Sequence, residues 1–254
     1  MFLQKLTFRA LRSNFIFTKP LSTLPSLQKD PQQAQLSEND DPTLQVPDYF
    51  NLYNTFTVRD LFNARVHYGH KEGSLDDCMK SYIYGSRLGH IIFDLDQTAR
   101  HLREALNITA HIAFRGGIIL FFNRNPQTGH MTETMAKECG EYAQTRHWRG
   151  GAFTNSRVQF AAVTRLPDLC VFFNTLNDVL AQHTAVRDSA KMNIPTIGIV
   201  DSNCNPNLIT YPVPGNDDSP ASIELYCRLF KNAVLVGKAK RKEALEARDK
   251  MEQK

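Results

Sequence analysis

The sequence predicts an α/β fold with a mainly parallel central sheet that is covered by helices on both faces. Short apolar runs alternate with longer stretches whose apolar residues recur at helical spacing. Near-continuous apolar strands belong to sheets buried on both sides, and their alternation with helices is typical of parallel sheets. Three of the runs end in a polar residue, namely Asn123, Asn174 and Asp201. Ligands of such folds bind at these strand ends, although the fold alone does not separate an enzyme from a binding protein.

The individual elements follow from the spacing of apolar residues and from the residues that stop each run. Strands are expected at 90–95, 118–123, 169–174 and 196–201, and helices at 96–115, 129–139, near 154–165, at 178–192 and from 219 onward. The first helix has Leu102, Leu106 and Ala110 at helical spacing, and Gly116 is expected to end it. Residues 213–218, VPGNDD, are expected to form the turn before the last helix.

Composition shifts divide the chain into four parts. Residues 1–29 place Lys5, Arg9 and Arg12 on one helical face and contain no acid, which is typical of a mitochondrial transit peptide; the alternative is a basic disordered tail. Residues 30–57 contain acids but no base and are interpreted as an acidic linker or arm. Residues 58–237 form the predicted domain, and 238–254 continue its last helix as a charged tail.

Bulk properties exclude several classes of protein. With 42% hydrophobic and 22% charged residues the chain resembles an ordinary globular protein, and no apolar run is long enough to span a bilayer, so no membrane partner is expected. The five cysteines are scattered, which favours a reducing compartment over a disulfide or zinc framework. The net charge is +4, but bases outnumber acids in 59–165 and acids outnumber bases in 166–230. The basic side would attract polyanions.

The stretch HIIFDLDQT, residues 90–98, raises the alternative of a Mg²⁺-dependent phosphohydrolase. In such enzymes an aspartate after a buried strand is the nucleophile and a second, two residues on, handles the proton, here Asp94 and Asp96. Asp217 and Asp218 would then be the acidic pair that holds the metal.

Other parts of that pattern are missing. The next strand ends at Asn123 without the hydroxyl that would hold phosphate, and Ser202, the only strand-end hydroxyl, follows Lys191 when it should precede it. We therefore interpret the stretch as a strand running into a helix, with Asp96 or Thr98 as the helix cap.

Two stretches interleave cations with aromatic residues and glycine, a pattern suited to RNA. They are ARVHYGHKEG at 64–73 and RHWRGGAFTN at 146–155. Arginine pairs with phosphate, rings stack on unpaired bases, and glycine lets backbone N–H groups approach. The alternative for each is a surface loop with a buried aromatic anchor. Zinc binding by His67, His70 and Cys78 lacks a fourth ligand at a usual spacing, and the glycine-rich phosphate loops of nucleotide sites are missing.

Taken in order, these motifs resemble one family, the universal small ribosomal subunit protein 2 in its bacterial and organellar form. The resemblance is carried by VHYGH (66–70), YIYGSRLGHIIFDLDQT (82–98), the helix and strand at 100–123, WRGGAFTN (148–155), IPTIGIVDSNCNP (194–206) and VPGNDD (213–218). It implies a flavodoxin-like three-layer sandwich and a structural, non-catalytic component of the small ribosomal subunit. With the transit peptide, the expected location is the mitochondrial matrix.

The resemblance also implies the partners, which are small-subunit rRNA and neighbouring ribosomal proteins. No cofactor, metal or small-molecule substrate is expected. The expected RNA-binding residues are Arg65, His67, His70, Lys71, Arg87, Arg146, Trp148, Arg149 and Asn155. The sequence departs from the bacterial pattern after WRGG, where residues 166–169 pass almost directly into a strand. The long helical hairpin of bacterial members is therefore expected to be missing or reduced.

Overall fold

The structure is a computed structural model, and it describes residues 43, 46–161, 164–177 and 181–252. The chain divides into two units, Met1–Pro47 and Asp48–Lys254, and the description below concerns the second. The predicted transit peptide at 1–29 and most of the predicted arm at 30–57 lie outside the described residues.

The centre of the second unit is a five-stranded parallel sheet. Its strands are β4 (Ile119–Phe122), β5 (Tyr142–Gln144), β6 (Leu169–Phe172), β7 (Thr196–Val200) and β8 (Tyr211–Pro214). Their spatial order is β5-β4-β6-β7-β8, and every pairing is parallel. This order, in which the second strand of the parallel sheet along the chain lies at its edge, is that of flavodoxin-like folds. The predicted α/β sandwich is therefore confirmed.

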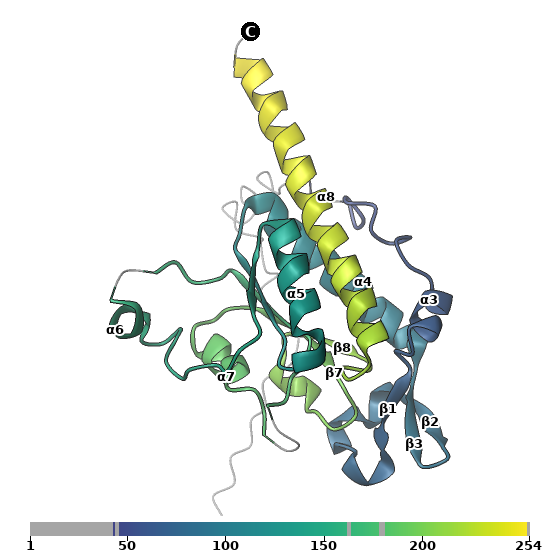
Figure 1. Cartoon of the computed structure of the whole chain (residues 1–254). Helices are drawn as coiled ribbons and strands as arrows, with labels where there is room; N and C mark the ends of the chain where they lie inside the picture. Colours follow the sequence, from purple (N-terminus) through teal and green to yellow (C-terminus); the bar gives the residue numbers. More distant parts are fainter. Residues whose placement is uncertain (1–42, 44–45, 162–163, 178–180, 253–254) are drawn as a thin grey trace, which may run out of the picture. The chain divides into compact units, whose positions relative to one another are not determined.

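Alternate strand residues point to opposite faces of this sheet, because side chains in a strand alternate. Phe121 and Val171 belong to one buried cluster, whereas Phe122 and Phe172 belong to a second. The first cluster is covered by α4 (Leu95–Arg115), α5 (Pro126–Cys139) and α8 (Pro220–Glu252), which lie side by side in Figure 1. The second is covered by α7 (Thr184–Lys191) and by the long connection between β5 and β6, which contains α6 (Ser156–Phe160). Two apolar layers on one sheet give the three-layer sandwich.

The segment at 90–95 is a strand, but it does not belong to the parallel sheet. It forms β3 (His90–Phe93), which lies between β1 (Tyr68–Lys71) and β2 (Ile83–Arg87) in a separate antiparallel sheet. The turn residues Leu88 and Gly89 both have positive φ, 54° and 76°. Two such residues match the twist of a tight hairpin, so β3 pairs with its neighbour in sequence.

The helix ends agree with the sequence in some places and differ in others. Gly116 ends α4 in the left-handed conformation, as predicted, but the cap at its start is Asp94 rather than Asp96 or Thr98. α5 begins three residues early because Asn125 caps it and Pro126 occupies its first position. α6 covers only part of 154–165. α7 begins after the cap His183, and residues 178–180 of the predicted helix lie outside the described part of the chain.

Residues 48–57, the last part of the predicted arm, pack against the domain. Phe50, Leu52 and Phe56 are each 3% exposed and belong to the cluster under α4 and α8. The compact unit therefore begins at Asp48, before the predicted domain start at 58. Among the described residues the remaining elements are the helix α3 (Val58–Asn63) and three 3₁₀ turns, Glu72–Ser74, Asp77–Tyr82 and Pro206–Leu208.

The predicted tail at 238–254 continues α8 without a break through Glu252. Near the middle of α8, Lys238 donates to the carbonyl oxygens of Cys139 (2.6 Å) and Gly140 (3.2 Å) at the end of α5. A cation at a helix C-terminus satisfies free carbonyls and complements the helix dipole. No helix among the described residues is long and apolar enough to cross a membrane.

Candidate nucleic-acid interface

The first basic stretch leads into the antiparallel sheet, where strand pairing brings three polar side chains into one row. Lys71 on β1 and Arg87 on β2 are both paired with His90 on β3, which lies between them. All three are exposed. Residues directly opposite one another in a sheet share a face. His90 is not among the residues predicted from the sequence, because its place between the two cations follows only from the strand order.

Arg65 precedes this sheet and is also exposed. Its φ is 61°, a left-handed conformation, and its carbonyl accepts a hydrogen bond from the Asn216 side chain at 3.1 Å. That bond joins the start of the stretch to the loop before α8. The guanidinium therefore lies on the surface while the backbone beneath it is fixed.

His67 lies inside the fold rather than on its surface. It is 8% exposed, its ring stacks on Phe62 with centroids 4.5 Å apart, and the ring of Tyr68 lies tilted against it at 4.2 Å. Burial lowers its pKa, which favours the neutral ring. This placement differs from the surface contact to RNA that the sequence predicted for His67.

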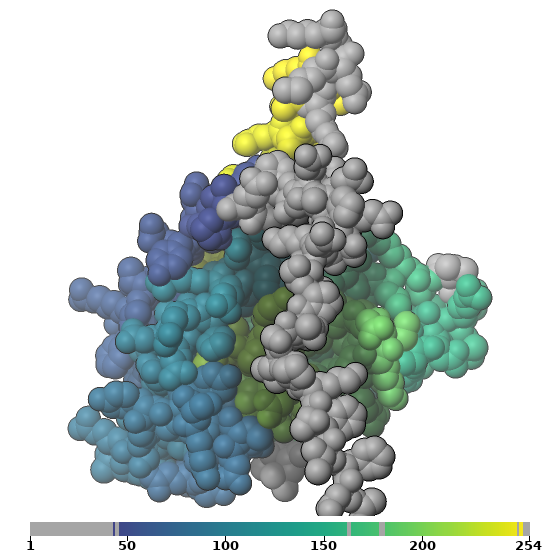
Figure 2. Space-filling model, turned by 180° about the vertical axis from the view of Figure 1, so that it is seen from behind, coloured from purple at the N-terminus to yellow at the C-terminus, as the bar shows by residue number. Residues whose placement is uncertain are grey.

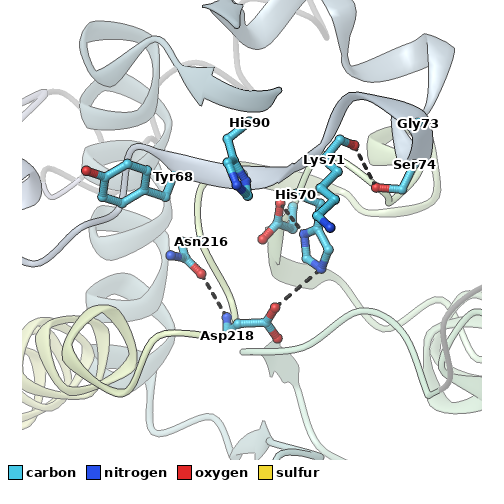
Figure 3. Close-up of a pocket in the computed structure, with 10 residues that line it drawn as sticks. Tyr68, His70, Lys71, Gly73, Ser74, His90, Asn216 and Asp218 are labelled. Atoms are coloured by element: carbon cyan, nitrogen blue, oxygen red, sulfur yellow. Dashed lines mark hydrogen bonds and ion pairs between the residues drawn. The ribbon is translucent and has the colours of Figure 1, made fainter. Parts of the chain in front are cut away.

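His70 is the centre of a charged cluster at the carboxyl end of the parallel sheet. Its Nδ1 lies 3.1 Å from Asp201 and its Nε2 lies 3.3 Å from Asp218, as Figure 3 shows for Asp218. The hydrogen bond to Asp201 raises the pKa of His70 from 6.5 to about 9. Its backbone N–H also donates to Ser202 Oγ at 2.9 Å. These bonds fasten β1 to the end of β7.

Asp217 lies deeper in the same cluster. It is 6% exposed, and burial together with the nearby Asp201 raises its pKa well above the usual range for a carboxyl group. It accepts a hydrogen bond from Asn174 Nδ2 at 3.3 Å. A depression of about 610 Å³ opens beside this cluster and is lined in part by Tyr68, Lys71 and His90.

In the second basic stretch, Trp148 is an anchor. It is 8% exposed, its Nε1 donates to Asp188 at 3.1 Å, and its ring meets Phe122 and Phe153 edge to face. With 8% of its surface exposed, the ring offers little area on which a base could stack. Only a conformational change would give it the stacking role predicted from the sequence.

The neighbours of Trp148 in this stretch are on the surface. Arg146, Arg149 and Asn155 are exposed. Gly151 has a φ of 85°, and the Asn155 N–H donates to its carbonyl at 2.8 Å, which closes a turn. In Figures 1 and 2 the antiparallel sheet and this stretch lie on opposite sides of the unit. The predicted residues therefore form two separate clusters.

Asp94 does not have the position that the phosphohydrolase alternative requires. It follows β3 of the antiparallel sheet, whereas Asn123, Asn174 and Asp201 follow strands of the parallel sheet. Both of its carboxylate oxygens are engaged, one by the Asp96 N–H at 3.1 Å and the other by the Gln97 side chain at 3.0 Å. Among the described residues, no group of histidine, cysteine or acidic side chains is arranged to hold a metal ion.

The capping role of Asp94 gives a first prediction. Asp94→Ala should lower the free energy of unfolding by about 1 kcal/mol, the usual loss of a helix N-cap, and Asp94→Asn should recover most of it because the amide oxygen also accepts. Urea denaturation of the full chain measures both. A loss under a few tenths of a kcal/mol for alanine would contradict the capping role.

The comparisons with known proteins agree on one family. A sequence model described as Ribosomal protein S2 matches residues 61–169 and 158–237. The two matches overlap between α6 and β6, where the sequence predicts the reduced insertion. In the connection between β5 and β6, the only helix among the described residues is the five-residue α6.

Individual relatives cover most of the chain. The small ribosomal subunit protein uS2m of Bos taurus is 56% identical over 223 residues, which are 88% of this chain and 74% of the bovine protein. The small ribosomal subunit protein uS2 of Phenylobacterium zucineum is 32% identical over 72% of this chain and 75% of its own length. The uS2 protein of Neorickettsia sennetsu is 32% identical over 80% of this chain and 83% of its own length.

The bovine relative is the mitochondrial form, and its similarity confirms the predicted mitochondrial localisation. The parallel sheet with its flavodoxin-like order, the family match over most of the described domain, and these relatives lead to the same conclusion. The chain belongs to the ribosomal protein S2 family.

Proposed function

We propose that this chain is a structural constituent of the mitochondrial small ribosomal subunit, where it binds small-subunit rRNA and neighbouring ribosomal proteins. The names of its relatives in cattle and bacteria support the assignment to a small ribosomal subunit. The engagement of both Asp94 carboxylate oxygens in helix capping supports a role without catalysis.

The observation that carries the RNA contact is the row of Lys71, His90 and Arg87 across the antiparallel sheet. Neighbouring strands lie about 4.8 Å apart, so the three side chains start within about 10 Å of one another. Two cations and an imidazole at that spacing suit a run of phosphates. The exposed side chain of Tyr84, 83% accessible on β2, offers a ring for stacking close by.

The second proposed contact is formed by Arg146, Arg149 and Asn155, with Arg65 adding to the first. We assign Trp148, His67 and His70 to a positioning role, because the first two are buried and the third is held in an ion pair. Through the strands and turns that they fix, these residues would set the places of the exposed cations.

Reversing the charge at the row tests this function. The double variant Lys71→Glu with Arg87→Glu should bind small-subunit rRNA at least about tenfold more weakly at physiological salt, and the slope of log affinity against log salt should fall by about 2. The variant should also fail to cosediment with the small mitochondrial subunit after a high-salt wash. Its unfolding transition should be unchanged, because both side chains are exposed.

A matched control has the same change of charge on another face. Lys137→Glu with Arg228→Glu alters exposed residues of α5 and α8, and should bind like the original chain if the row is the contact. Equal weakening of both variants would mean that net charge alone matters. Normal assembly of the first variant would remove the row from the interface.

A further inference from the structure

A second depression, of about 460 Å³, lies beside the edge strand β5. Its lining is mostly apolar. Ile118 and Leu120 contribute from the start of β4, Leu166 from the segment before β6, and Trp148 with Phe153 from the long connection after β5. Trp148 and Phe153 meet edge to face, so the floor is packed and fixed in shape.

The margin of this depression exposes large apolar side chains. Tyr142 on β5 and Phe160 on α6, which both line it, are 61% and 57% exposed, and Val158, also on α6, is 76% exposed. None of the residues of α6 is buried. A single helical turn gains too little from its own hydrogen bonds to be stable in water. Apolar side chains that gather around an apolar depression mark an interaction surface.

The charged residues around the depression, in the segment 142–167, are all basic. Residues 142–167 contain no aspartate or glutamate, and their cationic or titratable basic residues are Arg146, His147, Arg149, Arg157 and Arg165. Two acids flank this run: Glu141 is paired with Lys238, and Asp168 is engaged by Arg165 at 3.1 Å and by the Ile118 N–H at 2.8 Å. A partner that carries negative charge beside an apolar anchor would complement both properties.

We propose that this depression binds a segment of a neighbouring protein, in which an apolar side chain inserts between β5 and α6 and adjacent aspartate or glutamate residues face Arg157 and Arg165. The inference rests on the proposed function, because it takes the partner to be a neighbour within the small subunit. RNA fits this place less well than protein. A base needs hydrogen-bonding groups beside the ring on which it stacks, whereas the lining of this depression is mostly apolar.

Site-specific crosslinking in the assembled subunit tests the proposal. The photoreactive residue p-benzoylphenylalanine would be placed at Phe160, and in a second chain at Tyr84 on the antiparallel sheet. After incorporation into the small mitochondrial subunit and irradiation, the Phe160 position should give an adduct that resists ribonuclease. Its crosslinked peptide should contain aspartate or glutamate close to an apolar residue. The Tyr84 position should give a ribonuclease-sensitive adduct.

Charge reversal supplies the matched control. Arg157→Glu should lower the yield of the Phe160 adduct about tenfold, whereas Arg187→Glu, the same change at an exposed position of α7, should leave it unchanged. Three results would overturn this inference alone, provided that the subunit incorporates the chain. They are an RNA adduct at Phe160, no adduct at all, and a crosslinked peptide without acidic residues. Failure of every chain, including the unsubstituted one, to enter the subunit would overturn the proposed function as well.

Discussion

The variant His70→Gln should lower the free energy of unfolding by about 2 to 3 kcal/mol at neutral pH, with the loss shrinking as the pH rises. The hydrogen bond to Asp201 raises the pKa of His70 from 6.5 to about 9 in the folded protein. Each unit of difference between the folded and unfolded pKa corresponds to about 1.4 kcal/mol, and the partial exposure of the side chain reduces the total. Glutamine keeps a donor for Asp201 but removes the charge.

The direction of the pH dependence follows from the sign of the shift. Because the folded pKa lies above the unfolded one, the contribution of His70 is complete below pH 6.5 and is lost as the pH rises through about 9. Urea denaturation at about pH 6 and about pH 10 should therefore give a large difference between the two proteins at the lower pH and a small one at the higher. The buried carboxyl of Asp217 gives a pH dependence in the same direction, because its pKa is also raised, and the nearby His70 lowers that pKa.

His130→Gln is the control for His70, because His130 is exposed on α5. Its replacement should change stability by no more than about 0.5 kcal/mol at either pH. Hydrogen exchange adds a local test. Since His70 fastens β1 to Asp201 and Asp218, the amides of Tyr68–Lys71 should lose protection in His70→Gln before those of β6 do. Equal stability of His70→Gln and the original chain at about pH 6 would refute the role of the ion pair.

Gly237→Leu should destabilise the protein by about 3 kcal/mol or more, because α8 crosses α4 closely at this glycine. A Cβ at this position would lie 2.5 Å from the Ala110 carbonyl oxygen and 2.9 Å from the Ala113 Cβ. Backbone atoms cannot rotate away as a flexible side chain can, so the two helices would have to separate. That separation would open the apolar layer between them and the parallel sheet.

Ala239→Leu is the matched control, because Ala239 is exposed two residues further along α8. It adds the same side chain to the same helix and should change stability by no more than about 0.5 kcal/mol. Thermal and urea denaturation measure both variants. Similar stability of Gly237→Leu and Ala239→Leu would mean that α8 does not pack against α4 in solution.

Much of the parallel sheet could be predicted from the sequence, because its signals are local. Runs such as 118–123 and 169–174 are too short for helices and too apolar for the surface, so burial on both faces is their only stable arrangement. Gly116 and Gly140 end their helices in the left-handed conformation, which glycine adopts without steric cost. The edge strand β5 was missed because its three residues carry too little pattern, and the last strand β8 because two of its four residues are prolines, which are signals of turns.

The candidate site was predicted less completely. The exposed cations Arg65, Lys71 and Arg149 could be named because cations beside aromatic residues and glycine are a local pattern. The surroundings of these cations could not be predicted from the sequence. The same pattern grouped Trp148 with Arg149, although one is buried against Phe122 and the other is exposed. Residue type alone does not say which side of a turn faces the core.

The sequence by itself determined the order of helices and apolar strands, the ends of the helices α4 and α5 that glycine terminates, and the resemblance to the S2 family. Only the tertiary structure decided that Asp201, a residue 131 positions away, lies where it raises the pKa of His70. It also decided that His90 lies between Lys71 and Arg87. The physical reason is the sequence separation over which each interaction acts. Spacing and turn residues act over a few positions, whereas ion pairs and cross-strand neighbours exist only once distant segments have packed together.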